Sequence, residues 1–150
     1  MLVELVKRVL LIFLNGDNMG EAFTIKNYFD EVKNKRVLGS KCNECGNIHV
    51  PPRPICDHCQ SQSIERIELG GDATLEAFSI VYVPTSKMIE AGYGRDNPNC
   101  VGIVKMAEGP MLSAELHGFD LAHPEEIKIG SPVKAKFIER GENVILAFEA

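Results

Sequence analysis

Four cysteines in two closely spaced pairs are the residues of this chain best suited to chemistry. They follow the pattern C-x2-C-x10-C-x2-C and are Cys42, Cys45, Cys56 and Cys59. Two residues between paired cysteines let one tight turn aim both sulfurs at a common point, and Zn²⁺ favours four thiolates in a tetrahedron. Gly46 follows the first pair, where a positive φ lets backbone N–H groups turn toward the sulfurs. The spacing therefore predicts a zinc site.

The role expected of this site is structural. Four thiolates complete the tetrahedron and leave no position for water, so hydrolysis at the metal is not expected. An iron centre of the rubredoxin type uses the same four ligands, so zinc versus iron stays open, and paired redox disulfides are a further alternative. His49 or His58 could replace a cysteine, although four cysteines suffice. The fifth cysteine, Cys100, opens an apolar run and is expected to be a small core residue.

The cysteines lie in a module that follows a predicted helix. Residues 22–39 carry an apolar stripe at spacings of three and four, which predicts an amphipathic helix over 23–38 that stops at Gly39. The stripe consists of Ile25, Tyr28, Phe29 and Val32. Residues 40–62 contain the four cysteines but few large apolar side chains. This module cannot form a core of its own, so the metal is expected to hold it together.

Residues 63–150 alternate short apolar runs with turn residues, a pattern typical of a small closed β-barrel. Strands are expected over 64–69, 73–83, 100–106, 111–116, 132–140 and 143–149. Both alternating sets of side chains in the 73–83 strand contain apolar residues. Both faces of that strand are therefore expected to be covered, by the helix, by the zinc module or by a partner protein.

Residues 1–21 form an N-terminal extension of uncertain role. Residues 2–14 are strongly apolar but shorter than the roughly 20 residues that a helix needs to cross a bilayer. They are interpreted either as preceding a true start at Met19 or as a short amphipathic helix, in preference to a membrane anchor. Whether residues 1–18 belong to the native protein stays open. The usual features of a signal peptide are not seen, and paired cysteines suit a reducing compartment, so a cytoplasmic location is expected.

The cysteine motif and its surroundings resemble a known family. The motif runs KCNECG at 41–46, VPPR at 50–53 and CDHC at 56–59. It is similar to the signature of the family called domain of unknown function 35 (DUF35), and the resemblance extends over residues 22–150. It implies a mainly β fold in which an N-terminal helix precedes a rubredoxin-like zinc ribbon and a five-stranded OB-fold barrel.

The resemblance also implies a function. Members of this family are non-catalytic, acyl-CoA-associated partners of thiolase-fold enzymes. In archaea they resemble bridges between acetoacetyl-CoA thiolase and HMG-CoA synthase, at the head of the mevalonate route of isoprenoid biosynthesis. Such a bridge would pass acetoacetyl-CoA between active sites. Other members accompany thiolases or hydratases that act on different acyl-CoA substrates, so the partner and the acyl group stay open.

A loop after Pro84 is the candidate site for CoA or acyl-CoA. It is apolar, contains Tyr93 and is flanked by Lys87 and Arg95. It could lie along a pantetheine arm with its basic residues near the CoA phosphates, and a solvated loop without a ligand is the alternative. Arg53 could reach a CoA phosphate or a partner carboxylate, or simply brace the ribbon.

Two competing functions are disfavoured. An enzyme acting alone on acyl-CoA lacks a convincing catalytic set, because Ser113, His117 and His123 are isolated and are expected to be ordinary strand and loop residues. Nucleic-acid binding is the other alternative, since zinc ribbons and OB-folds do this elsewhere. Residues 61–150, however, contain 8 Lys and Arg against 14 Asp and Glu, a balance of −6. A phosphate backbone requires the opposite sign.

Overall fold

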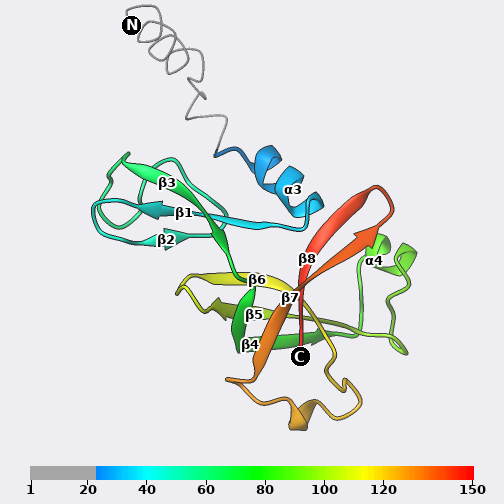
Figure 1. The fold of residues 1–150 in the computed structure, drawn as a ribbon. Coiled ribbons are helices and arrows are strands. Elements are labelled where there is room, and N and C mark those ends of the chain that lie inside the picture. Colours follow the sequence, from blue (N-terminus) through cyan, green and yellow to red (C-terminus); the bar gives the residue numbers. More distant parts are fainter. Residues whose placement is uncertain (1–22) are drawn as a thin grey trace, which may run out of the picture.

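The computed structural model describes residues 23–150, and Figure 1 shows a small β-sheet, a helix and a larger β-barrel. The predicted extension over 1–21 and its apolar segment lie outside the described residues. The elements in chain order are α3 (Ile25–Lys33), β1 (Val37–Cys42), β2 (Ile48–His49), β3 (Ile64–Leu69), β4 (Asp72–Val81), α4 (Ser86–Glu90), β5 (Asn99–Met106), β6 (Met111–His117), the 3-10 helix η1 (Pro124–Glu126), β7 (Pro132–Arg140) and β8 (Asn143–Glu149). One sheet has the order β2-β1-β3, and the barrel has the order β4-β5-β6-β8-β7. The predicted fold class, mainly β with a short helix, a four-cysteine region and a five-stranded closed barrel, is confirmed.

Helix α3 is capped and amphipathic. Thr24 caps its N terminus, where the side-chain oxygen accepts the backbone N–H of Asn27 at 3.3 Å. Tyr28 and Val32 are buried, one turn apart on the same face. Phe29 is half exposed, and its ring meets that of Tyr28 edge-on with 5.5 Å between the centroids. The buried face fixes the helix beside the ribbon sheet and the barrel.

The helix ends earlier than the predicted span 23–38. It stops at Lys33, and Lys35 then adopts a φ of +59°, which redirects the chain into β1. A lysine in this left-handed region is uncommon, so the apolar periodicity could not reveal it. Gly39, predicted to stop the helix, lies inside β1, where an added Cβ would sit 2.8 Å from the His49 carbonyl oxygen. This glycine therefore serves the close approach of β1 to β2.

Strand β3 belongs to the ribbon sheet. It pairs antiparallel with β1 along its whole length, from Val37 opposite Leu69 to Cys42 opposite Ile64. The sequence placed this strand in the segment 63–150 that was expected to form the barrel. The pairing joins it to the sheet that carries the first cysteine, because β1 would otherwise present an unpaired edge.

A β-bulge in β4 changes which side chains face the core. The register with β5 shifts between Leu75 and Ala77. Ala73 and Leu75 are buried before the bulge, whereas Phe78 packs against the core after it. The extra residue moves the inward set from odd to even positions, which explains why both alternating sets contain apolar residues. Val83, just beyond the strand, is 82% exposed, so neither the helix nor the ribbon covers it, and cover by a partner protein stays a prediction.

The core of the barrel receives a large apolar side chain from each of its strands. These are Leu75, Val104, Met106, Leu116, Val133 and Phe148. Cys100 lies in the same cluster, and burial raises the pKa of its thiol. A buried thiol with a raised pKa is a poor nucleophile, in agreement with the core role expected of it.

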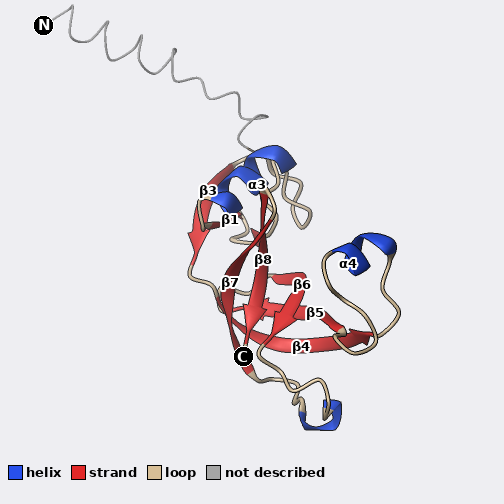
Figure 2. Ribbon diagram, turned by 90° about the vertical axis from the view of Figure 1, so that its right-hand side faces the viewer, coloured by secondary structure: helices blue, strands red, loops and turns tan. Residues whose placement is uncertain are grey.

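Helix α4 stands apart from this core. It has no buried residue, and Figure 2 shows it on a long loop beside the barrel strands. Its Ile89 is 60% exposed. Within residues 23–150, neither helix has the length and apolar character needed to span a bilayer.

Candidate functional site

The four cysteines lie on two turns with the same backbone geometry. In the first turn, the N–H of Gly46 donates to the Cys42 carbonyl at 3.0 Å, and Gly46 has a φ of +76°. In the second, the N–H of Gln60 donates to the Cys56 carbonyl at 3.0 Å, and Gln60 has a φ of +62°. The predicted role of Gly46 is thus matched in the second turn by a glutamine. A left-handed glutamine carries no sequence signal, so this equivalence could not be foreseen.

The sulfurs converge on one point. Cys42 Sγ lies 3.5 Å from Cys59 Sγ, and Cys45 Sγ lies 3.5 Å from Cys56 Sγ. All four sulfur atoms lie within 4.8 Å of one another. A tetrahedron with zinc–sulfur bonds of about 2.3 Å requires sulfurs about 3.8 Å apart. The residues present therefore fit a four-thiolate zinc site, whereas a disulfide would need sulfurs about 2.05 Å apart.

The protonation of these thiols shows why a cation is needed. The backbone N–H of Cys45, with other donors, lowers the pKa of the Cys42 thiol to about 6 against the opposing effect of burial. The backbone N–H of Ser61 acts in the same direction on Cys59, but burial and the neighbouring cysteines outweigh it and raise the pKa of that thiol to about 12. Four adjacent thiolates repel one another, so full ionisation of the cluster requires a positive ion among them.

The ribbon also positions Arg53. Its backbone N–H donates to the buried Ser40 hydroxyl at 2.9 Å, and its guanidinium lies 3.7 Å from the Asp57 carboxylate. Both of these charged side chains are more than half exposed. Arg53 borders an open cavity of about 210 Å³ between the ribbon and the β5–β6 hairpin, which contributes Pro110 and Met111.

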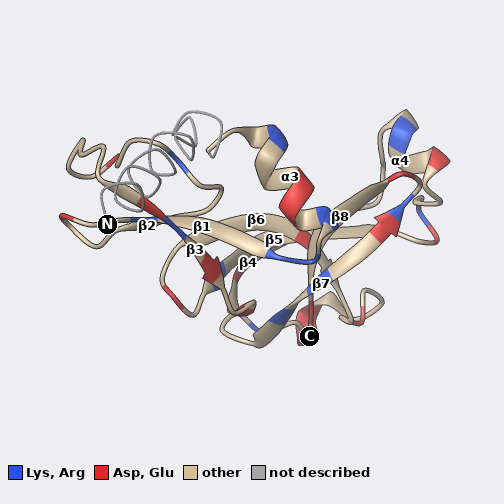
Figure 3. Cartoon of the chain, turned by 45° about the horizontal axis from the view of Figure 1, so that its top comes forward, with Lys and Arg blue, Asp and Glu red and all other residues tan. Residues whose placement is uncertain are grey.

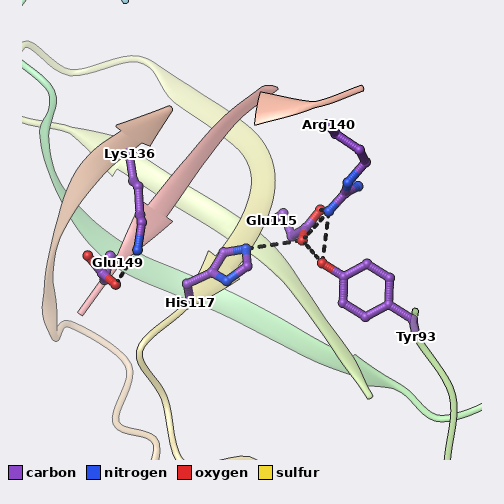
Figure 4. Close-up of polar contacts among 6 residues, drawn as sticks. All are labelled: Tyr93, Glu115, His117, Lys136, Arg140 and Glu149. Carbon is purple, nitrogen blue, oxygen red and sulfur yellow. Dashed lines mark hydrogen bonds and ion pairs between the residues drawn. The ribbon is translucent and has the colours of Figure 1, made fainter. Parts of the chain in front are cut away.

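A second cluster of polar side chains joins the loop after α4 to the barrel, and Figure 4 shows its members. The Tyr93 hydroxyl and the Arg140 guanidinium both donate to the Glu115 carboxylate, the guanidinium at 3.1 and 3.3 Å. His117 Nε2 lies 3.0 Å from the same carboxylate. The Arg140 guanidinium also donates to the Tyr93 hydroxyl at 2.9 Å and lies 5.4 Å from the centre of that ring.

The carboxylate of Glu115 is the centre of this cluster, and its side chain is only 10% exposed. Burial alone would raise its pKa, but the hydrogen bond from Tyr93 and the charge of Arg140 outweigh burial, so the pKa of Glu115 is lowered. Sequence reasoning missed Glu115 and Arg140. The available signal was a lone carboxylate in the mainly apolar run 111–116, but its partners are 22 and 25 residues away in the sequence.

The structure separates the residues predicted to bind CoA. Lys87, Tyr93 and Arg95 lie on or beside α4, whereas Arg53 lies on the ribbon, and Figures 1 and 3 show these two regions at opposite ends of the molecule. The hydroxyl of Tyr93 is engaged by Glu115 and Arg140. Figure 3 also shows basic positions interspersed with acidic ones along the described chain.

The histidines considered as catalytic candidates have local partners. His117 belongs to the Glu115 cluster, and His123 lies 3.3 Å from Glu125. Ser113 borders an apolar cavity of about 240 Å³ between α3 and the barrel, together with Phe29 and other apolar side chains. Neither histidine borders that cavity.

The fold and the site define a class of protein, a four-cysteine zinc ribbon followed by an OB-fold barrel. Residues 29–65 match the family described as "ChsH2, rubredoxin-like zinc ribbon domain", and residues 66–137 match "ChsH2, C-terminal OB-fold domain". The chain belongs to the DUF35 family, as the motif predicted.

Three similar proteins illustrate the range of the family. A "DUF35 domain-containing scaffold protein" of Methanothermobacter thermautotrophicus is 28% identical over 116 residues, covering 75% of this chain and 81% of that protein. A "probable enoyl-CoA hydratase alpha subunit" of Thermomonospora curvata is 27% identical, but the match spans only 34% of its length. Among solved structures, a chain of the "Ltp2-ChsH2(DUF35) aldolase" superimposes with a TM-score of 0.67 at 26% identity, covering 83% of this chain and 91% of that chain.

Proposed function

We propose that this protein is a non-catalytic scaffold for thiolase-fold enzymes that act on acyl-CoA substrates, with acetoacetyl-CoA thiolase and HMG-CoA synthase as its partners. The observation that carries this proposal is the similarity to a scaffold protein over 81% of that protein's length. Similarity to a chain of an aldolase named for two components, Ltp2 and ChsH2, supports an accessory role beside a catalytic component.

The chemistry of the proposed pair of enzymes explains the use of a scaffold. Condensation of two acetyl-CoA molecules to acetoacetyl-CoA is unfavourable, so rapid consumption of the product draws the reaction forward. A protein that binds both enzymes at once raises the effective concentration of each near the other without a new chemical step. The metal of the ribbon would then supply folding free energy to one of the binding surfaces rather than act on the substrate.

Affinity purification of the tagged protein from its own cells tests the partners. We expect acetoacetyl-CoA thiolase and HMG-CoA synthase to copurify, and a Cys42→Ser, Cys59→Ser double variant to recover less of at least one of them. Purified scaffold alone should show no turnover of acetoacetyl-CoA. Recovery of neither enzyme would reject the bridging role, and turnover by the chain alone would reject the non-catalytic role.

The proposal extends to CoA as a ligand of the α4 loop. Lys87 is exposed on α4 and Arg95 is exposed on the following loop, so their charges are available to phosphate groups. Calorimetric titration of CoA into the assembled complex should give a weaker affinity for a Lys87→Glu, Arg95→Glu double variant than for wild type. A Lys128→Glu, Lys134→Glu double variant, which changes the net charge by the same −4 at two exposed positions outside this loop, is the control. Equal CoA affinity in both variants would remove this loop from the binding site and leave the scaffold role intact.

A further inference from the structure

Several side chains around the predicted metal centre contact the carboxylate of Asp57. Asp57 follows Cys56 within the second cysteine turn. The amide of Asn47, just after the first turn, donates to Asp57 Oδ1 at 3.1 Å. His49 Nδ1, on β2, lies 3.4 Å from the same oxygen. The two cysteine turns are therefore linked by side chains as well as by the metal that their sulfurs would share.

The three contacts to Asp57 differ in burial: the Asn47 hydrogen bond and the Arg53 ion pair are exposed, whereas the His49 ring is buried. The guanidinium of Arg53 is 58% exposed and 3.7 Å from Asp57, so solvent and salt screen it. His49 is only 6% exposed, and its Nε2 is buried without a hydrogen-bond partner, which leaves Asp57 as the polar group that orients the ring. A ring nitrogen of His49, Cys56 Sγ and a carboxylate oxygen of Asp57 all lie within 4.8 Å of one another. The contact between His49 and Asp57 thus lies next to the Cys56 sulfur, one of the four that would bind the metal.

We infer that Asp57 is a positioning residue of the metal centre: by holding Asn47 and His49, it ties the second cysteine turn to the first and slows release of the ion. Release of Zn²⁺ would require one cysteine turn to move away from the other so that its two sulfurs detach. A side-chain contact between the turns opposes that movement without contributing a ligand. Loss of outer contacts of this kind typically weakens metal affinity about 10- to 100-fold.

Two variants separate the tie from the charge. Asn47→Ala removes the hydrogen bond and leaves the charge of Asp57 in place. Asp57→Ala removes the acceptor and the charge together. Glu44→Ala removes a carboxylate from inside the first cysteine turn, where Glu44 is exposed, and so reproduces the charge change of Asp57→Ala without breaking the contact. A general electrostatic role would make Glu44→Ala and Asp57→Ala behave alike, whereas a tie makes Asp57→Ala behave like Asn47→Ala.

The experiment measures the first-order release of Zn²⁺ from the loaded full-length chain to excess 4-(2-pyridylazo)resorcinol. We expect release to be about 10-fold faster or more for Asp57→Ala and Asn47→Ala, unchanged within about 2-fold for Glu44→Ala, and no faster in the Asn47→Ala, Asp57→Ala double variant than in Asp57→Ala alone. The Co²⁺-loaded variants should keep the charge-transfer bands of four thiolates, which shows that no ligand is lost. If Asp57→Ala does not fold, Asn47→Ala carries the test. Release from Asn47→Ala at the wild-type rate, or equal release from Asp57→Ala and Glu44→Ala, would overturn the inference.

Discussion

Replacement of Glu115 by alanine tests whether the polar cluster fixes the α4 loop to the barrel. The change leaves the Tyr93 hydroxyl and the Arg140 guanidinium without their shared acceptor. An unsatisfied buried donor costs about 1–3 kcal/mol. Arg140 is 39% exposed and can turn toward water, so most of the cost comes from Tyr93 and from the packing lost around a side chain that is only 10% exposed. We expect the free energy of unfolding to fall by about 2–3 kcal/mol.

The matched control is the exposed glutamate Glu125, which pairs with His123 at 3.3 Å just as Glu115 pairs with His117 two residues away. Both members of the control pair are at least 60% exposed, and such pairs contribute about 0–1 kcal/mol. In thermal unfolding of the Zn²⁺-loaded chain, Glu115→Ala should lower Tm by about 4–12 °C, and Glu125→Ala by about 2 °C or less. Equal shifts in the two variants would refute the assignment of Glu115 as an anchor.

Three further measurements test the pH dependence of this cluster, the metal site and the packing of the barrel. The cluster lowers the pKa of Glu115 from the ordinary 4.5. The ionised Glu115 side chain therefore contributes its full stabilisation above pH 4.5 and loses it as the pH falls through the lower pKa of the folded state. The free energy of unfolding, measured across the acid range, should depend less on pH in Glu115→Ala. Cys59→Ser should abolish stoichiometric zinc in metal analysis of the purified protein, and unchanged zinc would contradict the four-sulfur site. Gly102→Ala should destabilise the barrel by about 1–3 kcal/mol in urea unfolding, because its Cβ would overlap the Ala77 carbonyl oxygen, whereas Gly94→Ala, with open space around it, should cost less than about 1 kcal/mol.

Local patterns predicted the strands that are joined by short turns. The hairpin of β7 and β8 was expected over 132–140 and 143–149, and its strands have those bounds. Alternating side chains on either side of Gly141, which has a φ of +63°, carry that information within a few residues. The cysteine positions are equally local, because each pair is closed by a single turn.

Features that depend on distant parts of the chain could not be predicted. The pairing of β3 with β1 joins strands that are separated in sequence by most of the cysteine module. Hydrophobic periodicity predicts where a strand lies but not which distant strand it pairs with. The bulge after Leu75 follows from how β4 meets β5, and only its consequence, apolar residues in both alternating sets, was visible. The cluster around Glu115 requires the closed barrel to bring Tyr93 and Arg140 to one carboxylate.

The connection between ribbon and barrel bears directly on the proposed scaffold role. A scaffold raises effective concentration most when its two binding surfaces are held at a fixed separation. Here β3 passes into β4 through Gly70 and Gly71 alone, a junction that would be flexible without further contacts. The Glu108 carboxylate accepts the N–H of Gly70 at 2.8 Å, and the Gly71 carbonyl accepts the N–H of Ala135 at 2.8 Å. The β5–β6 turn and β7 therefore hold the two-glycine junction from the barrel side. Under the proposed scaffold role, these contacts would keep the separation between the ribbon and the α4 loop constant while each binds a different protein.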